Sequence, residues 1–212
     1  ISALHTGRSI DGWGNRFHRR WANNHSFLEI FWITAQRGRI NRCLGNIFKL
    51  VFANLDHIME SVKVNAGEGA TEIMISSEDM FLYEQLPNFE TNVPALEALF
   101  KGIISVPGIE TIQTSHITMA PVVKDPSIIE RLTPLLVPYS HVQHKDSTDP
   151  SNRAADPIIG LETGSARLFN TYMKGKAYPY KGHQWRDVIL KGMETLNRHN
   201  WFPFCTFIIG LP

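Results

Sequence analysis

The feature that most constrains the fold of this chain is an alternation of short apolar runs with amphipathic helical patterns along residues 28–212. The apolar, β-branched runs predict strands, and they cover residues 28–34, 70–76, 111–119, 157–161 and 202–211. Helical spacing predicts helices between them, over residues 55–67, 94–104, 166–173, 185–196 and a short stretch with a capping-box pattern from Ser127 to Glu130. This order predicts an α/β fold of about five β/α units, with helices covering a parallel sheet.

The spacing alone does not separate an open, doubly wound sheet from a partial barrel. Both architectures bind ligands at the carboxyl ends of their strands. Polar clusters stand at those ends, at residues 37–46, 76–79, 116 and 162–165. We therefore expect the functional site along this edge.

Three of the clusters carry recognisable motifs. Residues 158–167 read I-I-G-L-E-T-G-S-A-R, residues 207–212 read F-I-I-G-L-P, and residues 76–79 read S-S-E-D. In order and separation they resemble the radical S-adenosylmethionine (SAM) superfamily, in the branch often fused to a cobalamin-binding domain. The resemblance covers residues 28–212 and implies a partial (β/α) barrel of TIM type. Residues 1–27 contain Gly, Asn, His and Arg with no sustained apolar period, so we expect a poorly ordered basic arm there.

The resemblance implies a SAM site at the strand ends. The residues it implicates in SAM binding are Ser76, Ser77, Glu78, Glu162, Ser165, Arg167 and Gly210. Glu78 and its neighbour Asp79 would accept from the amino group of SAM; the alternative is a solvated loop pair, which explains their position at a strand end less well. Glu162 directly follows an apolar strand, where a carboxylate needs a partner. Ser165 either contacts SAM or caps the next helix, and Arg167 pairs either with the SAM carboxylate or with Glu162.

The resemblance also implies a [4Fe-4S] cluster, held by three cysteines on the loop after the first strand. In this sequence the three expected cysteine positions are occupied by Arg39, Cys43 and Asn46, so only Cys43 matches as a metal ligand. Arginine has no lone pair for a metal, and asparagine suits a soft site poorly. The departure predicts a disabled cluster site. In an intact relative, the resemblance further implies an electron donor such as ferredoxin or flavodoxin and an N-terminal cobalamin domain.

The sequence is compatible with three further hypotheses. The chain could be a non-catalytic barrel relic that binds a nucleoside or a partner, which the missing cysteines favour. It could be a zinc-dependent hydrolase using His141, His144 and either Asp146 or His116, because two histidines stand three residues apart. Residues 1–54 fit the family less well than the remainder, which is also what a corrupted reading of the coding sequence would produce.

Composition argues against several classes of partner. The formal net charge is +1, and the arginine-rich residues 1–42 contain no nucleic-acid-binding motif. No run reaches the roughly 18–20 apolar residues of a membrane span, and the two cysteines favour a reducing, cytoplasmic compartment. The chain begins with Ile1 and ends at a hydrophobic run, so we expect a fragment truncated before a sixth strand.

Overall fold

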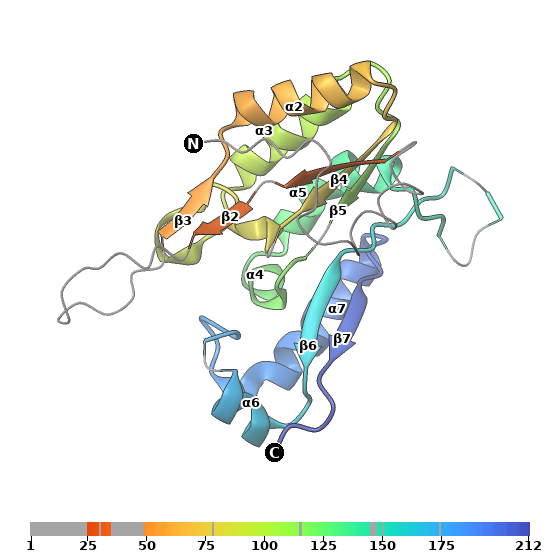
Figure 1. The fold of residues 1–212 in the computed structure, drawn as a ribbon. Helices are drawn as coiled ribbons and strands as arrows, with labels where there is room; N and C mark the ends of the chain where they lie inside the picture. The colour runs from red at the N-terminus through yellow and green to blue at the C-terminus, as the bar shows by residue number, and fades with distance from the viewer. Residues whose placement is uncertain are drawn as a thin grey trace, which may run out of the picture.

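The computed structural model describes residues 25–29, 31–34, 49–77, 79–114, 116–144, 148–149, 151–173 and 175–212. Helices and short strands alternate along this part of the chain (Figure 1). The strands are β1 (His25–Glu29), β2 (Phe31–Thr34), β3 (Lys49–Phe52), β4 (Glu72–Ser76), β5 (Thr111–Thr114), β6 (Ile158–Glu162) and β7 (Phe204–Phe207). The α-helices are α2 (Leu55–Gly67), α3 (Val93–Ile104), α4 (Met119–Lys124), α5 (Ser127–Leu136), α6 (Ala166–Tyr172) and α7 (Trp185–Arg198).

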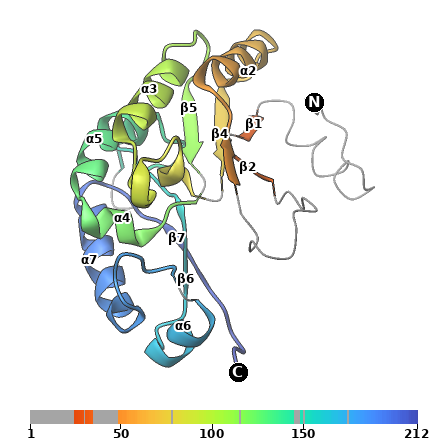
Figure 2. The same cartoon turned by 90° about the vertical axis from the view of Figure 1, so that its left-hand side faces the viewer.

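The parallel strands lie beside one another in chain order. β1, β4 and β5 form one sheet with the order β1-β4-β5, and β6 pairs in parallel with β7. A parallel bridge between His116 and Ile158 links the segment after β5 to β6. β2 and β3 form a separate antiparallel pair. In Figure 2, α3, α4, α5 and α7 lie together on one side of β4, β5, β6 and β7.

Local sequence explains where the two long helices before β5 begin. The Asn54 side chain accepts from the backbone N–H of His57 at 2.8 Å and so caps α2. Asn92 does the same for α3 by accepting from Ala95 N at 3.3 Å, and Pro94 occupies the first turn, where its missing N–H costs nothing. The buried residues of both helices belong to the same hydrophobic core as Ile73 of β4.

One continuous hydrophobic core joins the two strand groups. It contains the alternate residues Ile73 and Ile75 of β4, with Ile112 of β5 and Ile159 of β6, and the apolar faces of α3, α5 and α7. Trp201 is fully buried and donates from its indole Nε1 to Thr133 Oγ1 of α5 at 3.0 Å. The loop before β7 is therefore tied to α5, 68 residues earlier in the chain.

Several expected boundaries were wrong. Within the strand expected at 28–34, residues 28–29 belong to β1 and residues 31–34 to β2, and the two strands have different partners. β1 begins at His25, inside the expected arm of residues 1–27. The strand expected at 111–119 stops at Thr114 because α4 begins at Met119, and that expected at 202–211 is limited to β7. Ser127 forms no capping box, since its hydroxyl donates to Asp125 Oδ1 at 2.6 Å.

Candidate functional site

The carboxyl ends of β4 and β5 meet through the backbone. Met80 N, just after β4, donates to His116 O at 2.8 Å, and His116 Nδ1 lies 3.2 Å from Ser77 O. Ser77 is buried, and Ser76 is half-buried at the end of β4. The structure thus brings Ser76 and Ser77 together with His116, as the order of parallel strands requires.

Asp79 is the most perturbed carboxyl group at this edge. Its side chain is 6% exposed, Oδ2 accepts from Thr118 Oγ1 at 2.8 Å, and Oδ1 accepts from Phe81 N at 3.0 Å. Burial raises the pKa of Asp79 from 3.8 to about 6. Hydrogen bonds from the Thr118 side chain and from the backbone of Phe81 and Thr118, together with the electrostatic interaction with His116, offset only part of that rise. A buried carboxyl that titrates near neutrality at a strand end is a strong candidate for a functional group.

Glu162, at the end of β6, has its partner within the chain. Its carboxylate forms an ion pair with Lys176 Nζ, from the turn after α6, and both side chains are partly buried. The Glu162 backbone is left-handed with φ of 62°, next to an irregularity in the β6–β7 register between Gly160 and Glu162. A left-handed non-glycine residue is sparsely populated and often marks a functional site. The expectation that this carboxylate needs a partner is met by Lys176.

The remaining described candidates divide between helix capping and exposed surface. Ser165 accepts from Leu168 N at 3.4 Å and caps α6, which is one of its two predicted roles. Arg167 is exposed on α6, and Glu162 pairs with Lys176 instead of with Arg167. Gly210 has φ of +89°, and Ile208 N donates to Glu162 O at 2.9 Å, which holds the chain after β7 against the end of β6.

Cys43 and Glu78 lie outside the described residues, as do Arg39, Asn46 and Asp146. The other cysteine, Cys205, lies inside β7, where Sγ donates to Pro203 O at 3.6 Å. Burial raises the pKa of this thiol, so it favours the protonated form over the thiolate that a metal requires. The thiol is therefore the favoured form of Cys205 in this position.

The histidines considered for a zinc site face different neighbours. His141 lies between two carboxylates, with Nδ1 3.8 Å from Glu72 and Nε2 3.9 Å from Asp156. These acids stand at the amino ends of β4 and β6, opposite the edge where ligands are expected. His144 instead packs edge-on against Phe202 at 4.9 Å between ring centroids. Within the described segments, no three histidine, cysteine or acidic side chains group as metal ligands would.

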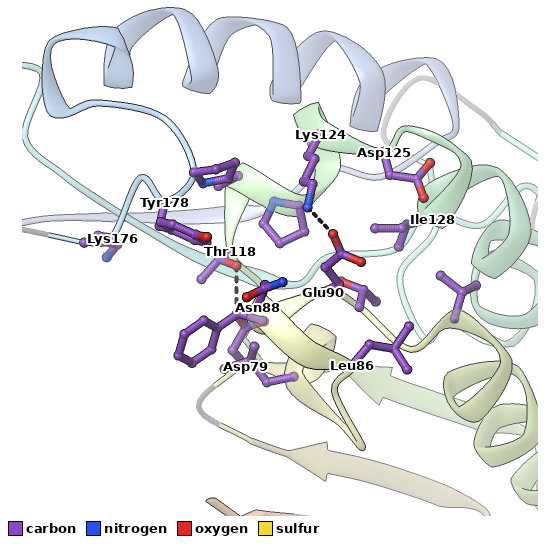
Figure 3. Close-up of a pocket in the computed structure, with 18 of the residues that line it drawn as sticks. Asp79, Leu86, Asn88, Glu90, Thr118, Lys124, Asp125, Ile128, Lys176 and Tyr178 are labelled. Atoms are coloured by element: carbon purple, nitrogen blue, oxygen red, sulfur yellow. Dashed lines mark hydrogen bonds and ion pairs between the residues drawn. The ribbon is translucent and has the colours of Figure 1, made fainter. Parts of the chain in front are cut away.

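A cavity of about 750 Å³ adjoins the strand-end residues. Its wall comes from residues 79–94, from the α4–α5 region at 118–131 and from the turn at 175–179. Figure 3 shows the Thr118–Asp79 hydrogen bond and the Lys124–Glu90 ion pair in this wall. Asp79 and Lys176 belong both to the cavity and to the strand-end group.

Two exposed aromatic rings belong to the cavity wall. Phe89 and Tyr178 are 62% and 56% exposed, and their rings meet edge-on with centroids 6.3 Å apart. Asn88 and Phe89 are consecutive left-handed residues with φ of 62° and 58°, an arrangement that costs of order 1–3 kcal/mol per residue. Sequence reasoning missed this wall. The only local signal was the Pro87-Asn88 pair, which is typical of a turn.

No family model matches this chain, and comparison with curated proteins gave no match. No helix in the described segments is both long enough and apolar enough to cross a membrane.

Proposed function

We propose that this chain is a partial (β/α) barrel of the radical-SAM type that binds SAM along the carboxyl ends of its parallel strands. The observation that carries the proposal is the position of the motifs. Ser76 and Ser77 end β4, and Glu162 ends β6, in a set of parallel strands that follow chain order. That order supports a barrel over a doubly wound sheet, in which the strand order reverses at a switch point.

Glu162 has the clearest part in this proposal. Its Oε1 is bound by Lys176, and Oε2 has no hydrogen-bond partner in the part of the chain that the structure describes. The ion pair orients the carboxylate, so Oε2 can accept from a ribose hydroxyl of SAM. Ser77 and Glu78 would bind the amino-acid part of SAM from the end of β4, and Gly210 would let the backbone approach it.

The residues of this chain do not fit a [4Fe-4S] cluster. Three thiolates are needed, whereas the sequence holds two cysteines. One of these, Cys205, is held in β7 as a thiol. We therefore propose SAM binding without radical generation by the chain as it stands, which unites the family resemblance with the binding-module hypothesis. An electron donor or a cobalamin domain would then serve only a relative with the full ligand set. The cysteine usage agrees with a cytoplasmic location.

Calorimetric titration with SAM tests the binding. We expect saturable binding that weakens at least tenfold in Glu162→Gln, because the amide loses the charge that Lys176 orients. The matched control is Glu110→Gln, an exposed residue before the amino end of β5, which should bind SAM like the parent chain. Absence of SAM binding in the parent, or equal losses in both variants, would refute the proposed site.

Anaerobic reconstitution with iron and sulfide tests the family separately. The parent chain is compared with an Arg39→Cys/Asn46→Cys variant for cluster absorbance and for cleavage of SAM to 5′-deoxyadenosine. Cluster uptake and cleavage by the double variant alone would support a disabled radical-SAM core. If neither protein assembles a cluster, the radical-SAM hypothesis fails and only the binding module remains.

A further inference from the structure

We propose that the cavity between residues 79–94, the α4–α5 region and the turn at 175–179 binds a small organic amine, with its ammonium group at Asp79 and its apolar body against Phe89 and Tyr178. The proposal is independent of SAM binding. Of the residues given a part in SAM binding under the proposed function, the cavity wall includes none. It shares with the strand-end group Lys176, which orients Glu162, and Asp79, which the sequence analysis placed beside Glu78.

Size and lining suit a small ligand. The cavity volume of about 750 Å³ lies within the range of about 300–1,000 Å³ found for ligand pockets. Leu86, Val93 and Ile128 supply apolar surface, and polar side chains, Asp79 among them, stand beside it in the wall. Such a combination binds an apolar body and orients it through one or two polar contacts.

The charges of the wall select a cation. Each basic side chain in it already has an acidic partner: Lys124 lies 2.7 Å from Glu90, Arg131 lies 2.7 Å from Glu97, and Lys176 pairs with Glu162. Asp79 forms no such ion pair with a lysine or arginine in the described segments. It accepts only neutral donors, from Thr118 and Phe81. A ligand ammonium would supply the missing positive charge, whereas an anion would find every cation already neutralised.

The aromatic pair fits the same ligand. Phe89 and Tyr178 present an edge-on pair at the wall, and aromatic faces attract both apolar groups and cations.

Three probes of nearly equal size separate charge from shape. These are 2-phenylethylamine, 2-phenylethanol and 3-phenylpropanoate, titrated into the full chain at a pH about two units above the Asp79 pKa. We expect the amine to bind at least tenfold more tightly than the alcohol, which corresponds to about 1.4 kcal/mol, and the anion to bind most weakly. Equal affinity for amine and alcohol, or no binding of the amine, would overturn the proposal.

Variants locate the ammonium. Asp79→Asn keeps the shape and both hydrogen bonds but removes the charge, and it should reduce amine affinity at least tenfold while leaving alcohol affinity unchanged. Asp187→Asn, an exposed carboxylate in the first turn of α7, is the matched control and should bind the amine normally. Tyr178→Leu should weaken both the amine and the alcohol. An undiminished amine affinity in Asp79→Asn would refute the assignment.

Competition distinguishes this site from the proposed SAM site. Saturating SAM should leave amine affinity unchanged, and Glu162→Gln should do the same. Displacement of the amine by SAM would mean that one site serves both ligands, which would overturn a separate amine site. A chain that binds the amine but not SAM would retain this inference and refute only the proposed function.

Discussion

Asp79→Asn should make the chain more stable at neutral pH and should remove a specific pH dependence of its stability. In the native state Asp79 is buried and receives hydrogen bonds from Thr118 and Phe81. An asparagine of the same shape keeps both contacts, because its Oδ1 can accept from Phe81 and its Nδ2 can donate to the Thr118 hydroxyl. The two proteins therefore differ mainly in whether a carboxylate must ionise away from water.

The magnitude follows from the pKa. Folding raises the pKa of Asp79 from 3.8 to about 6, and each unit is worth about 1.4 kcal/mol, so the ionised side chain destabilises the native state by about 3 kcal/mol. Below pH 3.8 the carboxyl is protonated in both states and the cost is absent. As the pH rises from 3.8 to about 6, the unfolded state ionises first, and native stability falls until the full cost is reached above that window.

Urea unfolding of both proteins across about pH 3.5 to 8 measures this effect. The free energy of unfolding of Asp79→Asn, minus that of the parent, should rise by about 3 kcal/mol between the acidic and neutral ends. Using the difference cancels the titration of groups that the substitution does not touch. Asp187→Asn should show no such change, because its carboxylate is exposed. A flat difference for Asp79→Asn, or one that falls with rising pH, would refute the burial argument.

Two further predictions concern the core and the sheet edge. Leu99→Ala in α3 removes a fully buried side chain and should lower the free energy of unfolding by about 2–5 kcal/mol in urea titrations. The control Leu190→Ala changes a side chain that is 58% exposed and should lower it by less than about 1 kcal/mol. Equal losses in the two variants would contradict the assigned core. β7 pairs only with β6 in the described segments, and both Phe207 at its end and Ile209 beyond it are exposed. An exposed strand edge of this kind promotes self-association, so the double variant Phe207→Lys/Ile209→Lys should form fewer oligomers in sedimentation velocity. A parent chain that stays monomeric at high concentration would contradict this prediction.

The sequence predicted the candidate site only in part. It placed Glu162 at the end of a strand and required a partner for it, but the partner, Lys176, follows α6 and reaches Glu162 only because the turn folds back. It left Ser165 between two roles, and the structure shows the cap of α6. The sequence places Asp79 beside Glu78 at a strand end, yet the hydroxyl that Asp79 accepts from belongs to Thr118, 39 residues later. No local pattern encodes such a contact.

The sequence by itself determined the alternation of strands and helices, because the side-chain periods of a strand and a helix follow from backbone geometry within a few residues. The stripe of α3 and the alternation of Ile73 and Ile75 in β4 could be read for that reason. Tertiary structure decided the split of residues 28–34 into β1 and β2 and the shape of the cavity. Tertiary structure also decided which charged side chains form ion pairs, such as Glu162 with Lys176. These features arise where distant segments meet, and there burial and hydrogen bonding depend on positions accurate to about an ångström.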